Sequence, residues 1–109
     1  MDITEQIVTV IDELDEVSKK LWQCNEEAYK VFERKCTGWM EIINKVLTDL
    51  SIWGKQDNDI PLDVIFRQIK NLENALRDKD DFMLADTLKY EISNTLNYYL
   101  EIVNEYGKE

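Results

Sequence analysis

The sequence predicts an all-α protein, and three observations favour this class. The 109 residues include only three Gly and one Pro, too few for a sheet protein rich in turns. Apolar residues make up 44% and charged residues 33%, a balance typical of a folded helical domain. Apolar residues also recur at alternating spacings of three and four, which is the pattern of one narrow stripe on a long helix. This run comprises Ile7, Val10, Leu14, Val17, Leu21, Cys24, Ala28 and Val31.

The first two helices are predicted from this stripe and from the residues that flank it. The first helix covers about residues 3–32, and the basic pair Arg34–Lys35 that follows suits the negative end of a helix dipole. The second helix begins near Thr37, whose hydroxyl is able to cap backbone amides, and ends before Gly54. A polar loop then follows.

Two further helices are predicted in the second half of the chain. Pro61 suits the first turn of a helix because it needs no amide partner, and the charged residues 78–80 end that helix. A fourth helix begins at about Asp81 and continues to Tyr106, before Gly107. We therefore expect one domain, residues 1–109, folded as an antiparallel up-down-up-down four-helix bundle with long first and fourth helices and coiled-coil-like packing.

The expected helix lengths predict a partner-binding surface. At 1.5 Å per residue the first and fourth helices reach roughly 45 and 39 Å, and the other two about 25 Å each. The start of the first helix and the end of the fourth therefore overhang, where apolar residues are in excess. We predict that a symmetric homodimer or a partner protein's amphipathic helix covers this surface. The alternative is that the first helix breaks near Lys19–Lys20 and the chain covers the surface itself. The predicted partner-binding residues here are Ile7, Val8, Ile11, Tyr98, Tyr99, Ile102 and Val103.

Charge and segment composition exclude several classes of partner. The net charge of −10, from 23 acidic and 13 basic residues, disfavours binding to nucleic acid and to anionic membranes, because both are bound through clustered Lys and Arg. The acidic first residues do not fit a secretory signal, and no apolar run approaches a membrane span. We expect a cytoplasmic protein in which Cys24 and Cys36, about 18 Å apart along one helix, remain free thiols.

The search for catalytic chemistry is mostly negative. No histidine is present, which excludes Ser-His and Cys-His nucleophile pairs and the zinc-binding HExxH helix. The three glycines are isolated, so there is no Gly-rich phosphate loop. Trp22, Trp39, Trp53, Phe32 and Phe66 are candidates for a ligand pocket, although aromatic residues at helical spacing more often form core. We expect no catalytic residue, no cofactor and no metal site.

One enzymatic alternative stays open, because hard cations such as magnesium need only oxygen ligands. The order Met83-Leu84-Ala85-Asp86 is similar in pattern to the second motif of the all-α nucleotide pyrophosphohydrolases, which use Glu-x-x-Glu on one helix and Glu-x-x-Asp on another. Glu13 and Glu16 fit the first pair. In the second motif Met83 stands at the position of the first acid, with Asp86 at the second. A thioether is a poor magnesium ligand, so the resemblance implies at most a divergent enzyme.

Residues 74–92 carry a second resemblance. The order Lys79-Asp80, Phe82, Leu84-Ala85-Asp86, Leu88 and Tyr90-Glu91 is similar to a stretch in small helical proteins of Firmicutes that are grouped as a domain of unknown function. The resemblance implies a helical fold and a role for Asp86, Tyr90 and Glu91, and it implies no reaction. The preferred interpretation is a non-enzymatic protein-interaction or chaperone-like bundle.

Overall fold

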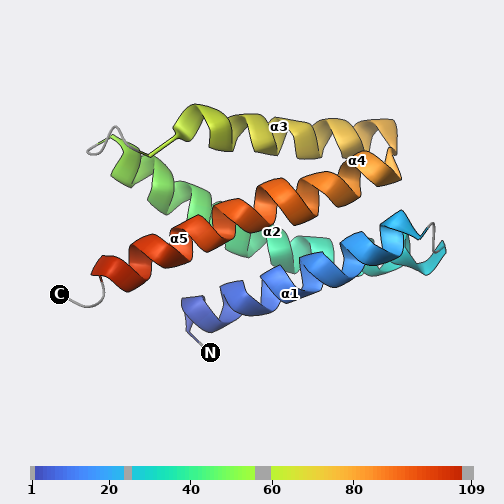
Figure 1. Ribbon diagram of the computed structural model, residues 1–109, viewed down its shortest axis with the longest axis horizontal. Helices are drawn as coiled ribbons and strands as arrows, with labels where there is room; N and C mark the ends of the chain where they lie inside the picture. The colour runs from blue at the N-terminus through green and yellow to red at the C-terminus, as the bar shows by residue number, and fades with distance from the viewer. Residues whose placement is uncertain (1, 24–25, 56–59, 107–109) are drawn as a thin grey trace.

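The computed structural model describes residues 2–23, 26–55 and 60–106, and within these residues it contains helices and no strand. The all-α class with four helical segments is therefore confirmed. In Figure 1, α1 and α3 run from left to right, and the segments that follow them return from right to left. The elements are α1 (Ile3–Trp22), α2 (Glu26–Gly54), α3 (Leu62–Asp78), and one continuous segment made of α4 (Asp81–Asp86), the π-helix η1 (Thr87–Ile92) and α5 (Ser93–Tyr106).

The boundary predicted between the first two helices is wrong. α1 ends at Trp22, and α2 then runs without interruption from Glu26 through Thr37 and Gly38 to Gly54. The apolar stripe continues across the boundary because Leu21, near the end of α1, and Ala28, near the start of α2, are both buried. A spacing of three and four cannot distinguish one long helix from two helices whose stripes meet in one core. The second helix is therefore the longest, at about 43 Å.

Gly38 lies inside α2 although glycine weakens a helix by roughly 1 kcal/mol relative to alanine. Buried aromatic residues on either side compensate for this cost, since Phe32 and Trp39 pack edge to face with ring centroids 5.7 Å apart. Burial of these two side chains in the core thus favours a continuous helix where the low helix propensity of glycine indicates a break. Thr37 is not a helix cap. Cys36, also in α2, is a half-buried free thiol, and Cys24 lies outside the described residues.

The later boundaries agree with the sequence. α2 ends at Gly54, where a Cβ atom would lie 2.6 Å from Cδ1 of Leu62, so a larger residue requires the Leu62 side chain to move. Pro61 precedes the first residue of α3. The Asp80 carboxylate caps α4 by accepting a hydrogen bond of 3.0 Å from the amide of Met83. Gly107, the predicted end of the last helix, lies outside the described residues.

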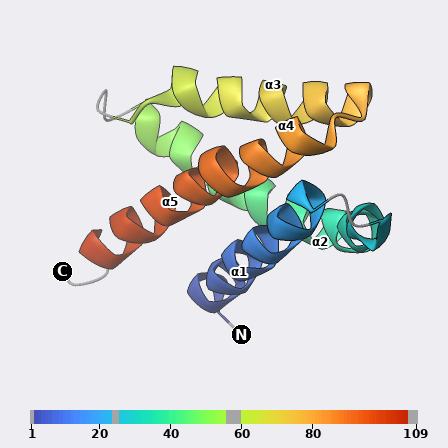
Figure 2. The same cartoon turned by 45° about the vertical axis from the view of Figure 1, so that its right-hand side comes forward.

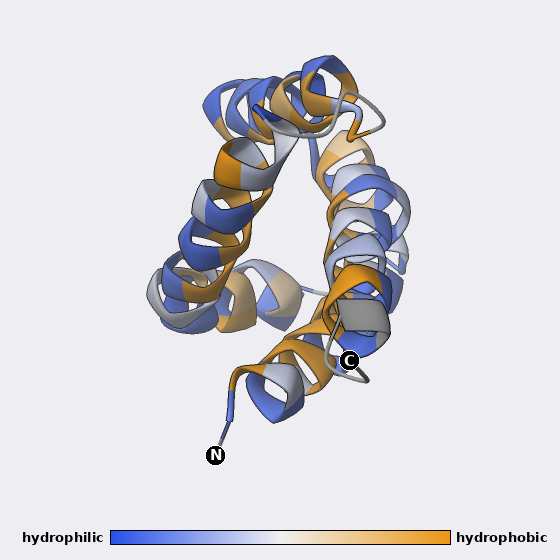
Figure 3. Ribbon diagram, turned by 90° about the vertical axis from the view of Figure 1, so that its left-hand side faces the viewer, coloured by the Kyte–Doolittle hydropathy of each residue, from blue (hydrophilic) through white to orange (hydrophobic). Residues whose placement is uncertain are grey.

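The last helical segment lies at the centre of the molecule. α1 packs against α4, η1 and α5, and α3 packs against α4 and η1. α2 packs mainly against α1. Figure 2 shows the α4–α5 segment crossing between α3 and α1, and Figure 3 shows the apolar parts of the helices turned toward one another. None of the described helices combines the length and the apolar character that crossing a bilayer requires.

The π-helix η1 has a physical explanation in the spacing of the core residues. Leu84, Leu88, Ile92 and Leu96 are all buried and follow one another at four-residue intervals. On an ideal α-helix each interval drifts by about 40°, so the stripe would turn away from α1 and α3. The wider π turn removes part of this drift. Ser93 closes the turn, because its hydroxyl donates a hydrogen bond of 2.9 Å to the Leu88 carbonyl, five residues earlier.

Candidate interaction surfaces

The residues predicted to bind a partner at the chain ends separate into a buried group and an accessible group. Ile7 and Tyr99 are buried within the chain itself. Val8 is 45% exposed, and Ile11, Tyr98, Ile102 and Val103 are half-buried against the core. The expected overhang is wrong, because α1 ends at Trp22 and is shorter than α2. What remains accessible is a smaller apolar area on α1 and α5, which we call the terminal surface (Val8, Ile11, Ile102 and Val103).

Tyr99 has a structural role in this region. Its ring stacks on Trp53 with centroids 5.4 Å apart and planes 13° apart, and its hydroxyl donates a hydrogen bond of 2.7 Å to Oδ2 of Asp49. Burial of the phenol, together with the hydrogen bond to Asp49, raises the pKa of Tyr99 to about 12. These contacts join α5 to α2 and explain why Tyr99 is not available to a partner.

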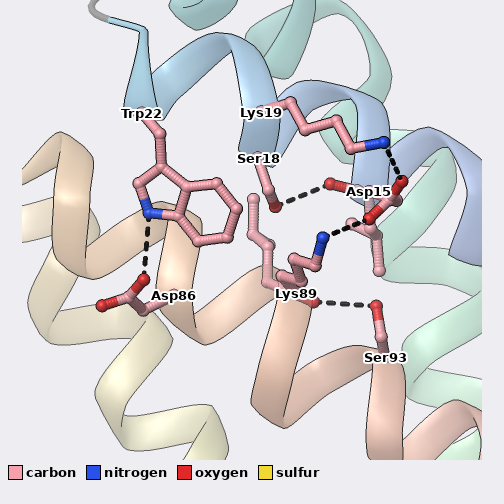
Figure 4. A network of polar contacts seen from close by, with 9 residues as sticks. Asp15, Ser18, Lys19, Trp22, Asp86, Lys89 and Ser93 are labelled. Carbon is pink, nitrogen blue, oxygen red and sulfur yellow. Dashed lines mark hydrogen bonds and ion pairs between the residues drawn. The ribbon is translucent and has the colours of Figure 1, made fainter.

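A second group of side chains gathers where α1 crosses the start of η1 (Figure 4). Trp22, the last residue of α1, donates a hydrogen bond of 3.0 Å from Nε1 to Oδ1 of Asp86. The ring of Tyr90 lies 5.9 Å from the Trp22 ring, centroid to centroid, and is tilted by 39°. The Lys89 ammonium lies 5.4 Å from the Trp22 ring centroid, within the range of a cation–π contact. Trp22 therefore contacts three residues of the last helical segment.

The same lysine also forms an ion pair with α1. Lys89 Nζ lies 2.8 Å from Oδ1 of Asp15, and Lys19 Nζ lies 3.1 Å from Oδ2 of the same carboxylate. Hydrogen bonds from Lys89 and then Lys19 lower the pKa of Asp15 below its ordinary value. The pair in turn raises the pKa of Lys89, chiefly through the hydrogen bond to Asp15. Asp15 and Lys89 thus fix the position of η1 on α1.

The predicted group of Asp86, Tyr90 and Glu91 is divided between two faces. Asp86 and Tyr90 both lie at Trp22. Glu91 accepts a hydrogen bond of 2.9 Å from Nδ2 of Asn71 on α3, and so belongs to the contact between α3 and η1. Sequence reasoning did not connect Trp22, Asp15 and Lys89 with this group. No local pattern in the sequence indicates these contacts, because they depend on how α1 crosses η1.

The aromatic residues proposed as a ligand pocket lie in separate places. Trp22 contacts Asp86, Trp39 packs on Phe32, and Trp53 stacks on Tyr99. Phe66 is exposed on α3. These residues therefore do not line one common pocket.

Two of the three acidic residues of the enzymatic alternative, Glu13 and Glu16, are engaged with basic side chains, and the third, Asp86, accepts a hydrogen bond from Trp22. Glu13 forms an ion pair and hydrogen bond with Lys35, and Glu16 forms an ion pair of 3.6 Å with Lys20. In the described part of the chain, no group of three or more Asp, Glu, Cys or His side chains is placed to hold a metal ion. The alternative of a divergent magnesium-dependent enzyme stays a prediction without a described set of ligands.

Comparisons of the chain with protein-family models, with curated proteins and with solved structures found no match. The resemblance of residues 74–92 to a Firmicutes family therefore stays a prediction.

Proposed function

We propose that this protein is a non-enzymatic interaction module that associates with a second copy of itself through the terminal surface. The supporting observation is the exposure of an apolar side chain on α1. Val8 is 45% exposed, and the half-buried Ile11 lies one helical turn after it. Ile102 and Val103 extend the apolar area onto α5, which packs against α1.

A symmetric dimer suits this surface because an isologous interface brings the same patch of both copies together. Each copy then buries the Val8 side chain of the other and completes the burial of Ile11 and Ile102. Burying the exposed part of a valine contributes roughly 1 kcal/mol, so the two copies of Val8 contribute about 2 kcal/mol together. Loss of this contribution weakens association by about 30-fold.

Net charge opposes the association of two copies. Each chain carries a net charge of −10, so two chains repel one another at low ionic strength. Salt screens this repulsion, with a Debye length of about 10 Å at 0.1 M and about 3 Å at 1 M. We therefore expect self-association to strengthen as salt is added.

The test is sedimentation velocity over a dilution series, with two matched variants. Val8→Gln removes the exposed apolar side chain of the terminal surface without adding charge. Val64→Gln makes the same change on α3, where Val64 is 47% exposed. We expect the wild-type chain and Val64→Gln to dimerise with similar affinity and Val8→Gln to dimerise about 30-fold more weakly. A wild-type chain that stays monomeric at every concentration, or two variants equally weakened, would contradict the proposal.

A further inference from the structure

The aromatic side chains around Asp86 form an exposed face on α4 and η1. Phe82 lies one helical turn before Asp86 and is 54% exposed, and Tyr90 lies one turn after it and is also exposed. Trp22 completes the group from α1 through its contacts with Asp86 and Tyr90. We call Trp22, Phe82, Asp86 and Tyr90 the aromatic-acid face. Single exposed apolar side chains are common on proteins, whereas several that lie close together are typical of binding sites.

The position of Asp86 in this face is fixed, and its charge is not neutralised. Trp22 Nε1 donates to Oδ1, which holds the carboxylate in one orientation and leaves Oδ2 for another donor. Among the residues that the structure describes, no lysine or arginine forms an ion pair with Asp86. An oriented carboxylate between two exposed rings is a suitable partner for a cation.

The chain itself shows how this environment holds a cation. Lys89 places its ammonium 5.4 Å from the centroid of the Trp22 ring and 2.8 Å from the Asp15 carboxylate. One aromatic ring and one carboxylate thus hold one cation beside Trp22 (Figure 4). Asp86 and Tyr90 also contact Trp22 and provide a second carboxylate and a second ring, and no lysine or arginine among the described residues forms an ion pair with Asp86.

We propose that the aromatic-acid face binds an arginine-containing segment of a partner protein. The guanidinium of one arginine stacks on Tyr90 and forms an ion pair with Oδ2 of Asp86, and a second arginine of the segment stacks on Phe82, about 12 Å away along the helix axis. Arginine fits better than lysine because its planar group stacks on an aromatic ring while it donates to a carboxylate. Charge complementarity supports a basic partner, since the chain has a net charge of −10 and Asp81 lies exposed beside Phe82.

This inference rests on the proposed role as an interaction module and assigns a second partner to a separate surface. The two contacts respond oppositely to salt. Screening weakens an attraction between the acidic chain and a basic peptide, whereas it strengthens association between two acidic chains. The Val8→Gln chain, which lacks the terminal surface, therefore retains peptide binding. Peptide binding and self-association are thus able to fail independently.

The experiment is a titration of the ¹⁵N-labelled full chain with a blocked hexa-arginine peptide, followed by NMR. The indole N–H signal of Trp22 reports directly on the face, and the signals of Trp39 and Trp53 serve as internal references. The double variant Phe82→Ala/Asp86→Asn removes one ring and the charge. The control Phe66→Ala/Asp63→Asn makes the same changes on α3, where Phe66 is 53% exposed and Asp63 is also exposed.

We expect the peptide to shift the Trp22 signal in the wild-type chain, in Val8→Gln and in the control. The Phe82→Ala/Asp86→Asn variant is expected to bind about tenfold more weakly, as loss of one cation–π contact and one ion pair predicts. The control is expected to change binding less than twofold. Absence of a Trp22 shift would overturn the proposal, as would an equal loss in both double variants, because that result indicates attraction to net charge alone. Unchanged positions of the reference signals show that each variant is folded.

Discussion

Trp22 and Asp86 are 64 residues apart in sequence, and Nε1 of the one lies 3.0 Å from Oδ1 of the other. The hydrogen bond joins the last residue of α1 to the last residue of α4, directly before the π-helix. The end of α1 is therefore attached at the point where the last helical segment changes its periodicity. Both the stability of this crossing and the shape of the aromatic-acid face depend on this contact.

A double-mutant cycle measures the contact. Trp22→Phe removes the donor and keeps an aromatic ring, and Asp86→Ala removes the acceptor. We expect each single variant to lower the free energy of unfolding by about 1 kcal/mol, because the bond is lost in both. The double variant is expected to lose less unfolding free energy than the two single variants together. The difference, which is the coupling energy of the two side chains, is expected to be about 0.5 to 1 kcal/mol when measured by urea denaturation. Strict additivity would show that the two side chains do not interact.

The ion pairs of Asp15 predict an order of pKa changes. The hydrogen bond from Lys89 is the main cause of the lowered Asp15 pKa, and that from Lys19 is the second. Lys89→Gln is therefore expected to raise the Asp15 pKa toward its ordinary value of 3.8 more than Lys19→Gln does. NMR titration of the Asp15 carboxyl carbon measures both changes. The pKa of Asp15 is lower in the folded chain than in the unfolded chain. The ion pairs of Asp15 therefore stabilise the folded state above the ordinary pKa, and this stabilisation is lost as the pH falls through the pKa of the folded chain. A larger rise of the Asp15 pKa in Lys19→Gln than in Lys89→Gln would contradict these contacts.

Tyr99 predicts a loss of stability at high pH. Its pKa is about 12 in the folded chain against an ordinary value of 10.0, chiefly because the phenol is buried. A raised folded pKa supplies stability that is present below pH 10.0 and lost as pH rises toward 12. The difference in unfolding free energy between wild type and Tyr99→Phe should therefore fall by about 2 to 3 kcal/mol across this range. Denaturation at a series of pH values measures it, and a constant difference would refute the assignment.

Substitution by alanine is expected to change stability in opposite directions at the two glycines of α2. Nothing lies within 4 Å of a Cβ atom added at Gly38, so Gly38→Ala is expected to stabilise the chain by about 0.5 to 1 kcal/mol. At Gly54 the added atom meets the Leu62 side chain at 2.6 Å, so Gly54→Ala is expected to destabilise by about 1 to 3 kcal/mol. Thermal and urea unfolding compare the pair. A Gly38→Ala variant without added stability would indicate that α2 does not continue through residue 38.

The fold class and most helix ends follow from local signals in the sequence. Pro61 and Asp80 mark boundaries because Pro61 lacks a backbone N–H at the start of α3 and the Asp80 carboxylate accepts from an amide of α4. Gly54 ends α2 where the chain approaches Leu62. The division between α1 and α2 could not be predicted in this way. The apolar stripe continues from Leu21 to Ala28, and Gly38 indicates a break where long-range packing maintains a helix.

The candidate site was predicted in part. Asp86 and Tyr90 were singled out by a resemblance, and the structure places both at Trp22. Glu91 faces Asn71 instead, because consecutive residues of a helix point in directions about 100° apart, so Tyr90 and Glu91 do not share a face. Lys89 and Asp15 were not predicted, since their pairing depends on how α1 crosses η1, and sequence spacing within either helix contains no information on that crossing.

The most direct test of the proposed self-association is an isotope-filtered NOE experiment on an equal mixture of ¹³C-labelled and unlabelled chains at high concentration. The filter retains only contacts between two different molecules. We predict NOEs between the methyl groups of Val8 in one chain and those of Ile11, Ile102 or Val103 in the other, and they should strengthen with added salt. A spectrum without intermolecular NOEs to Val8, or with such NOEs only to residues of α3, would contradict the proposal.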